Sequence, residues 1–130
     1  MLDIGVAVDA DQMVLVSEPS LALSDGYYWF LYPLIERLAE ETGQYVDLYG
    51  DAVFAGGDLL ALRRMLSEAR GLVETRGESW EVRTGTQVVP LTREVYSPVW
   101  RDEFLRLITT WDQAAVRAGE LGGVVVCVGD

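Results

Sequence analysis

The sequence contains no histidine and no lysine, and these two absences exclude several kinds of chemistry. Without histidine there is no Ser-His or Cys-His nucleophile, no imidazole acid or base, and no zinc site with a histidine ligand. Without lysine there is neither a P-loop lysine nor a Schiff base. Any catalysis would therefore rest on carboxylates or on the one cysteine.

Cysteine occurs once, as Cys127 inside the apolar run "VVVCV". A single cysteine cannot form an intramolecular disulfide, and no neighbouring residue would activate its thiol. We therefore expect Cys127 to be buried in a strand rather than to act as a nucleophile.

Long apolar runs are also absent. The two longest, "YYWFLYPLI" and "GGVVVCVG", fall far short of the roughly 20 residues that span a bilayer. The opening "MLDIGVAVDA" lacks the charged and apolar regions of a signal peptide. These features predict a cytoplasmic protein that does not enter a membrane.

Positive charge is scarce. The sequence has ten arginines against 21 acidic residues, which gives a formal net charge of −11. Such a field repels nucleic acid and anionic membranes and accelerates association with basic partners. Arginine favours fixed, bidentate ion pairs. Arg63, Arg64 and Arg70 form a small basic group that could bind an anion, but we expect them to pair with acids of neighbouring elements.

Apolar residues at helical spacing predict a first helix that ends at Gly43. Ser24 or Asp25 is expected to cap its start. Pro33 is tolerated only near a first turn, so the regular helix either begins around Tyr32 or kinks at the proline. The aromatic residues at this entrance are expected in the core, with a partner surface as the alternative.

Two further helices follow from the same spacing. The second is predicted to begin at Asp58, as its cap, and the third at Ser97 and Pro98. Glycines from Gly119 onward are expected to end the third. The apolar face of the second helix is Leu59, Leu62, Met65, Leu66, Ala69, Leu72 and Val73, and that of the third is Trp100, Phe104, Leu107, Ile108, Trp111, Ala114, Ala115 and Ala118.

β-rich runs predict the strands. "LDIGVAV" and "MVLVS" form one predicted hairpin, and "WEVRT" and "QVVPL" form a second about Gly85, with Pro90 at a sheet edge. "SEPSLALSDGYYW" is expected to be a loop. "YVDLY" alternates like a half-buried strand, and "AVF" is a candidate short strand that pairs back on it. "VVVCV" is predicted as a buried central strand.

These elements predict one globular domain over residues 1–130. The order is ββαβ(β)αββαβ, with three main helices and a mixed sheet of about five to seven strands. The predicted class is α/β, with α+β as the alternative.

Carboxylates are the remaining candidates for metal or acid-base chemistry. Asp9 and Asp11 have a spacing that can bind a divalent cation, although residues flanking a hairpin turn commonly share it. "DLYGDAVFAGGDL" fails the calcium-loop template. Asp47, Asp51 and Asp130 could gather at strand ends, where α/β sheets commonly bind ligands. We predict no metal site and no cofactor.

A folded, acidic domain with four Trp and six Tyr and no recognisable catalytic set suits binding better than catalysis, so we do not expect an enzyme. The candidate partner-binding residues are Asp47, Tyr49 and Asp51, together with Glu40 and Glu41. Their charges would steer and pair a basic protein surface.

In size, acidity and lack of catalytic motifs the chain resembles the immunity proteins of bacterial toxin systems, which block a toxin's active site or surface. That resemblance implies an inhibitor of a basic partner such as a bacterial toxin or nuclease domain. Two alternatives stay open. One is a non-inhibitory interaction module or homodimer that uses the aromatic entrance of the first helix, and the other is a carboxylate-based or anion-binding enzyme.

Overall fold

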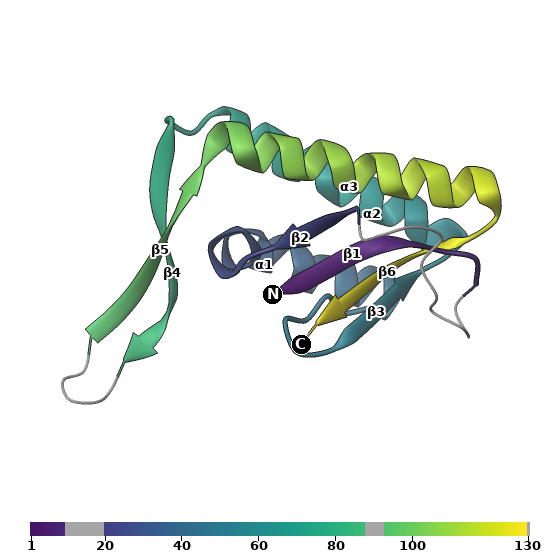
Figure 1. Ribbon diagram of the computed structural model, residues 1–130, viewed down its shortest axis with the longest axis horizontal. Helices are drawn as coiled ribbons and strands as arrows, with labels where there is room; N and C mark the ends of the chain where they lie inside the picture. Colours follow the sequence, from purple (N-terminus) through teal and green to yellow (C-terminus); the bar gives the residue numbers. More distant parts are fainter. Residues whose placement is uncertain (10–19, 88–92, 130) are drawn as a thin grey trace.

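The computed structural model describes residues 1–9, 20–87 and 93–129, and within them the order of elements is ββαβαββαβ (Figure 1). This order confirms the predicted α/β class, without the optional extra strand. The elements are β1 (Leu2–Ala7), β2 (Leu21–Leu23), α1 (Asp25–Thr42), β3 (Asp51–Phe54), α2 (Gly57–Glu74), β4 (Ser79–Gln87), β5 (Arg93–Trp100), α3 (Arg101–Leu121) and β6 (Val124–Gly129).

Four strands form an antiparallel sheet in the order β2-β1-β6-β3. β6 lies between β1 and β3 and is buried from Val124 to Cys127, which confirms the predicted central strand. The described strands form this sheet and a second two-stranded one, both antiparallel, rather than one mixed sheet. Pairing of β1 with β6 places Leu2 beside Gly129.

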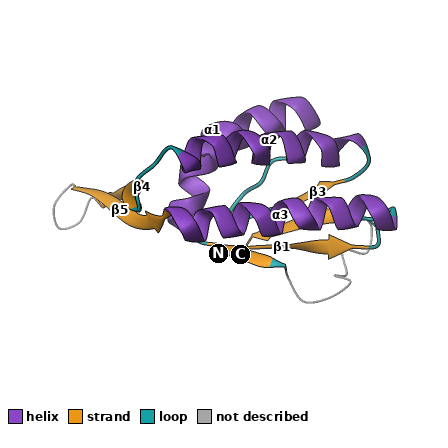
Figure 2. Ribbon diagram, turned by 90° about the horizontal axis from the view of Figure 1, so that it is seen from above, coloured by secondary structure: helices purple, strands orange, loops and turns teal. Residues whose placement is uncertain are grey.

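The three helices cover one face of the four-stranded sheet (Figure 2). Alternation along the strands turns residues such as Leu2, Ile4 and Phe54 toward them. The helices contribute most of the predicted apolar stripes, including the fully buried Trp111. Two predicted members are exposed: Leu72 of α2 at 47%, and Trp100, which belongs to β5, at 51%. One continuous core therefore joins helices and sheet.

The second sheet is a ribbon of β4 and β5 that projects from the body (Figure 1). Its base packs on aromatic rings of α1 and α3. The ring centroid of Trp80 lies 5.3 Å from that of Phe30 and 6.2 Å from that of Phe104. The Arg76 guanidinium lies over Phe30 and Trp80, at 5.2 and 5.3 Å from their ring centroids. These contacts fix the ribbon where it leaves the body.

Helix starts agree only in part with the sequence prediction. α1 begins at Asp25, directly after the predicted cap residue Ser24, and not around Tyr32. It continues through Pro33, because burial of Tyr28, Leu31 and Leu34 on both sides of the proline offsets its lost hydrogen bond. Ser24 is its N-cap residue but makes no side-chain capping bond.

Asp58 is not the cap of α2. The N-cap is Gly56, in a backbone conformation with φ of 54°. Asp58 lies in the first turn, where its negative charge is favourable toward the helix dipole.

Three strand predictions were wrong. Leu21–Leu23, expected in a loop, pairs with β1, and "YVDLY" has no ladder partner. β4 runs through Gly85 with a bulge beside it and pairs with β5, so Ser97 and Pro98 belong to a strand. Pro98 is tolerated there because a two-stranded ribbon has open edges. "MVLVS", Asp11, Pro90 and Asp130 lie outside the described residues.

Candidate functional site

The segment between α1 and β3 carries most of the predicted site. Gly43, with φ of 78°, ends α1, and its N–H donates to the carbonyl oxygen of Ala39 at 2.8 Å. The chain then turns back along α1, where the Tyr28 hydroxyl donates to the carbonyl oxygen of Val46 at 2.8 Å. Burial alternates along this segment as predicted, although contact with the core, not a strand ladder, produces the pattern.

The segment ends in a tight turn against the end of β6. One carboxylate oxygen of Asp47 accepts the N–H of Tyr49 at 3.0 Å, which is an Asx turn. A Cβ placed on Gly129 would lie 2.5 Å from the carbonyl oxygens of Asp47 and Leu48. Glycine at this position therefore allows the turn to pack directly on β6. The Gly129 N–H donates to the carbonyl oxygen of Gly50 at 2.8 Å.

Strand register adds an acid that sequence reasoning missed. Val128 of β6 pairs with Asp3 of β1 on one side and with Asp51 of β3 on the other. The three side chains therefore share one face, and all three are exposed. Neighbouring strands lie about 4.8 Å apart, so the two aspartates are about 10 Å apart. Only the topology of the sheet brings residue 3 next to residue 51.

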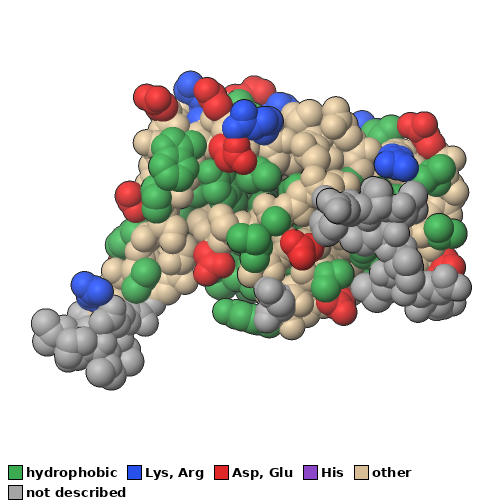
Figure 3. Space-filling view, viewed as in Figure 1, with side chains coloured by type: hydrophobic (Ala, Val, Ile, Leu, Met, Phe, Trp, Pro, Cys, Tyr) green, Lys and Arg blue, Asp and Glu red, His purple; other side chains and the backbone are tan. Residues whose placement is uncertain are grey.

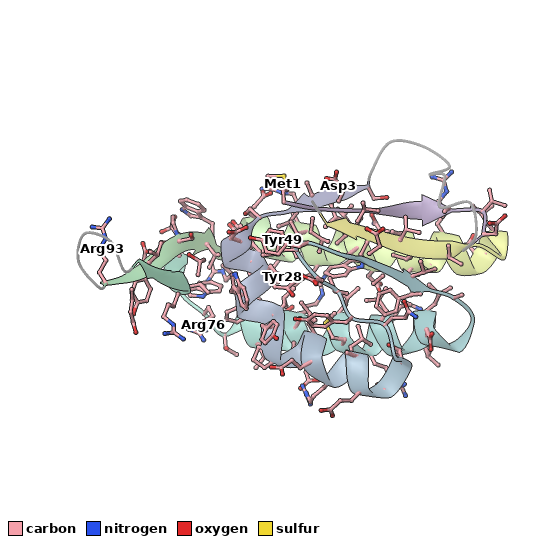
Figure 4. The ribbon with its side chains drawn as sticks, turned by 90° about the horizontal axis from the view of Figure 1, so that it is seen from below. Met1, Asp3, Tyr28, Tyr49, Arg76 and Arg93 are labelled. Atoms are coloured by element: carbon pink, nitrogen blue, oxygen red, sulfur yellow. The ribbon has the colours of Figure 1, made fainter. Side chains whose placement is uncertain are left out.

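Asp3, Asp47, Tyr49 and Asp51 thus lie together at one end of the sheet, and we call them the sheet-end patch. Figure 4 shows Asp3 and Tyr49 in the part of the body that is nearer the ribbon, whose far tip carries Arg93. Tyr49 is 80% exposed. The patch is an open surface. A hollow of about 490 Å³ lies elsewhere, lined by residues at the start of α2, at the end of α3 and just after β1.

Glu40 and Glu41 are not part of this patch. They lie in the last turns of α1, eight to thirteen positions after the tyrosines that hold the Asp47 segment. That separation is about 12 to 20 Å along the helix axis. The Glu41 carboxylate also pairs with Arg64 of α2. The structure therefore divides the predicted set into a sheet-end group and a helix-end group.

Charge is distributed unevenly over the molecule. All ten arginines lie between residues 37 and 117, so none belongs to the four-stranded sheet or to the segment that precedes β3. Figure 3 shows acidic side chains but no arginine over the strands in front, whereas arginines lie along the helices and on the ribbon.

Of the three arginines predicted to pair with neighbouring acids, Arg63 and Arg64 do so, whereas Arg70 bonds to a threonine. Arg63 bonds to Asp112 at 2.9 Å, and Arg64 bonds to Glu41. The Asp112 contact also raises the pKa of Arg63. Arg70 donates to the Thr109 hydroxyl. Among the residues that the structure describes, no ion pair includes a carboxylate of the sheet-end patch.

A group of tyrosines supports the Asp47 segment. The Tyr45 hydroxyl donates to the Tyr32 hydroxyl at 3.0 Å. Burial raises the pKa of Tyr28, and hydrogen bonding to Tyr45 raises the pKa of Tyr32 to about 12. The negative charge of Asp47 adds to both shifts. These hydroxyls therefore stay protonated near neutral pH and keep their hydrogen bonds.

The thiol and the carboxylates of the described residues can be compared with the chemistry considered from the sequence. Cys127 is fully buried, and burial raises the pKa of its thiol. No three acidic or cysteine side chains in the described part of the chain gather closely enough to hold a metal ion. Within the same residues, no helix combines the length and apolar character needed to cross a membrane. No protein-family model, curated protein or solved structure matches this chain.

Proposed function

We propose that this protein is an acidic protein-binding domain that inhibits a basic partner, as the immunity proteins of bacterial toxin systems do. The observation that carries the proposal is the separation of charge. The sheet-end patch holds three aspartates in a part of the molecule without arginine, whereas Glu41, Glu68 and Asp112 of the helix layer are each paired with an arginine. An unpaired anionic surface attracts a cationic one.

The geometry of the patch suits a protein surface better than a small molecule. It is open, and Tyr49 presents most of its ring beside Asp47 and Asp51. Tyrosine is enriched among residues that dominate binding energy, and a ring flanked by carboxylates can pack on the stem of an arginine whose head group is paired. Two cationic side chains about 10 Å apart would each meet one of the aspartates on β1 and β3.

Inhibition in this proposal needs no reaction. The described residues of the patch are acids and a tyrosine, with no nucleophile and base in contact. The protein would act by covering the active site or another essential surface of its partner. A cytoplasmic toxin or nuclease domain is the proposed class of target, and neither nucleic acid nor membrane is a proposed partner.

The first test compares three baits in lysate of the source organism. The baits are the wild-type protein, a patch variant with Asp3→Asn, Asp47→Asn and Asp51→Asn, and a control variant with Glu74→Gln, Glu78→Gln and Glu120→Gln. Both variants remove three negative charges. Asparagine at position 47 keeps the oxygen that accepts the Tyr49 N–H, so the turn is retained.

We expect wild type and control, but not the patch variant, to retain one basic protein in stoichiometric amount, and high salt to release it. Adding the wild-type protein should then abolish the partner's enzymatic or toxic activity. Equal capture by all three baits would contradict the site. Stable binding that leaves the partner fully active would contradict inhibition and favour an interaction module.

A further inference from the structure

The β4–β5 ribbon carries an exposed aromatic stripe that the proposed function does not use. Tyr96, Pro98 and Trp100 are alternate residues of β5 and therefore share one face, which we call the outer face of the ribbon. Tyr96 is 52% exposed and Trp100 is 51% exposed. The intervening Val99 is fully buried against the body.

The outer face is held in a fixed shape. The Tyr96 hydroxyl donates to a carboxylate oxygen of Glu94 at 2.7 Å, and Arg83 reaches the other oxygen at 3.3 Å. At the base, the backbone N–H of Trp100 donates to the Tyr27 hydroxyl at 3.3 Å. Little order therefore has to be gained when this face binds a partner, which favours association.

The exposure of these aromatic side chains indicates that another protein surface covers them. An isolated two-stranded ribbon is only marginally stable in water, and aromatic side chains contribute large apolar areas when they are covered. Figure 3 shows hydrophobic side chains on the ribbon at the left of the molecule and acidic side chains over the sheet. The outer face of the ribbon and the sheet-end patch are formed by different strands.

The charge pattern of the outer face complements itself and therefore fits a second copy of this chain. Residues 79–100 contain two arginines and two glutamates, so their net charge is zero and the whole −11 lies elsewhere. Glu81 lies opposite Pro98, and Arg83 lies opposite Tyr96, one step along the same face. Consider a two-fold axis that runs across the ribbon, midway between the pair Glu81–Pro98 and the pair Arg83–Tyr96. It places Arg83 of each copy against Glu81 of the other copy, and Tyr96 against Pro98.

We propose that the outer face of the ribbon is the contact of a two-fold symmetric homodimer. Such a contact uses the same patch on both copies and must complement itself, which the alternation of Glu81 and Arg83 achieves. The projection of the ribbon also keeps the two acidic bodies apart (Figure 1). At separations beyond the Debye length of about 10 Å in 0.1 M salt, their repulsion is largely screened.

The size of the face sets the strength of the dimer. Eight residues of β5 at about 3.3 Å each give a length of about 26 Å, and two strands give a width of about 10 Å. This area of a few hundred Å² falls below the roughly 800 Å² per partner of a standard stable interface. The dimer is therefore weak and depends on concentration.

Sedimentation velocity of the full chain tests this directly, between about 10 and about 500 µM and in about 0.1 M and 1 M NaCl. We expect the average sedimentation coefficient to rise toward that of a dimer as the protein concentration increases. Salt should change this association little, because the repulsion between the bodies is already screened and surface ion pairs contribute little, whereas it should strongly weaken capture of a basic partner.

Variants of exposed residues identify the face. Tyr96→Ser and Arg83→Glu should each raise the dissociation constant of the dimer at least about tenfold. The double variant Glu81→Arg with Arg83→Glu restores opposite charges across the axis and should recover much of the association lost in Arg83→Glu alone. Leu72→Ser, which changes an exposed apolar residue of α2, is the matched control and should dimerise like wild type.

A wild-type chain that stays monomeric at about 500 µM in both salts would overturn the proposal. So would a dimer that survives both Tyr96→Ser and Arg83→Glu, because another face would then form it. The outcome is independent of the proposed function: the Asp3, Asp47 and Asp51 variant should still dimerise, and the two ribbon variants should still capture the basic partner.

Discussion

At the scale of single residues, Tyr28 links the core to the sheet-end patch. Its ring is buried at the start of α1, and its hydroxyl bonds to the backbone of the segment that carries Asp47. This residue was predicted as core or partner surface from its place in an aromatic run. Its hydrogen-bond acceptor, Val46, is 18 positions away in the chain, so this contact could not be predicted from local sequence.

Tyr28 also gives the molecule a dependence on alkaline pH. Its pKa is raised in the folded state, so above the ordinary tyrosine pKa of about 10 the unfolded chain loses a proton that the folded chain keeps. The stabilisation is complete below pH 10 and is lost as pH rises further. In urea unfolding, Tyr28→Phe should cost about 1 kcal/mol at pH 7 and reduce the fall in stability above pH 10.

Tyr96 is an exposed tyrosine that can be compared with the buried Tyr28. Tyr96 bonds to Glu94 at the surface, so Tyr96→Phe should leave the free energy of unfolding at pH 7 almost unchanged. If Tyr28→Phe retained the full alkaline dependence of the wild type, the role assigned to Tyr28 would be wrong.

At the scale of elements, the two helices with regular apolar stripes and the central strand β6 could be predicted, because burial on one face imposes a period on the sequence. The ribbon could not. Ser97 and Pro98 form a local helix-start signal, but pairing with β4 and packing of Val99 into the core override it. β2 has only three residues. Such a short run shows no clear alternation of apolar and polar residues, and the turn-forming residues around it favoured a loop.

Docking of α1 on the ribbon depends on Gly26. A Cβ there would lie 2.9 Å from Cγ1 of the buried Val99 and 3.3 Å from Cβ of Ser97. We therefore expect Gly26→Ala to lower the free energy of unfolding by about 1 to 3 kcal/mol. Denaturant titration of the wild type and the variant measures this change.

Gly71→Ala is the matched control for that substitution. Gly71 is exposed in the interior of α2, and a Cβ there would meet nothing within 4 Å. Alanine should raise the free energy of unfolding by about 0.5 to 1 kcal/mol, because glycine is entropically unfavourable in a helix. A Gly26→Ala variant that is as stable as the wild type, or stabilised like Gly71→Ala, would contradict the close contact between α1 and β5.

At the scale of the whole molecule, charge separates into a helix layer with paired arginines and a sheet layer without arginine. The acidic character of residues 47–51 and their proximity could be predicted from sequence. The membership of Asp3 could not, since it depends on β6 lying between the first strand and the third. The separation of Glu40 from Asp47 likewise depends on the chain turning back along α1.

The central claim is that the sheet-end patch steers a basic partner. The most direct measurement is the association rate of the captured partner with the wild type, the patch variant and the Glu74, Glu78 and Glu120 control, at low and high salt. At low salt the patch variant should associate about tenfold more slowly than the other two, and at high salt the three rates should converge. A patch variant that binds as fast as the wild type at low salt would contradict the claim.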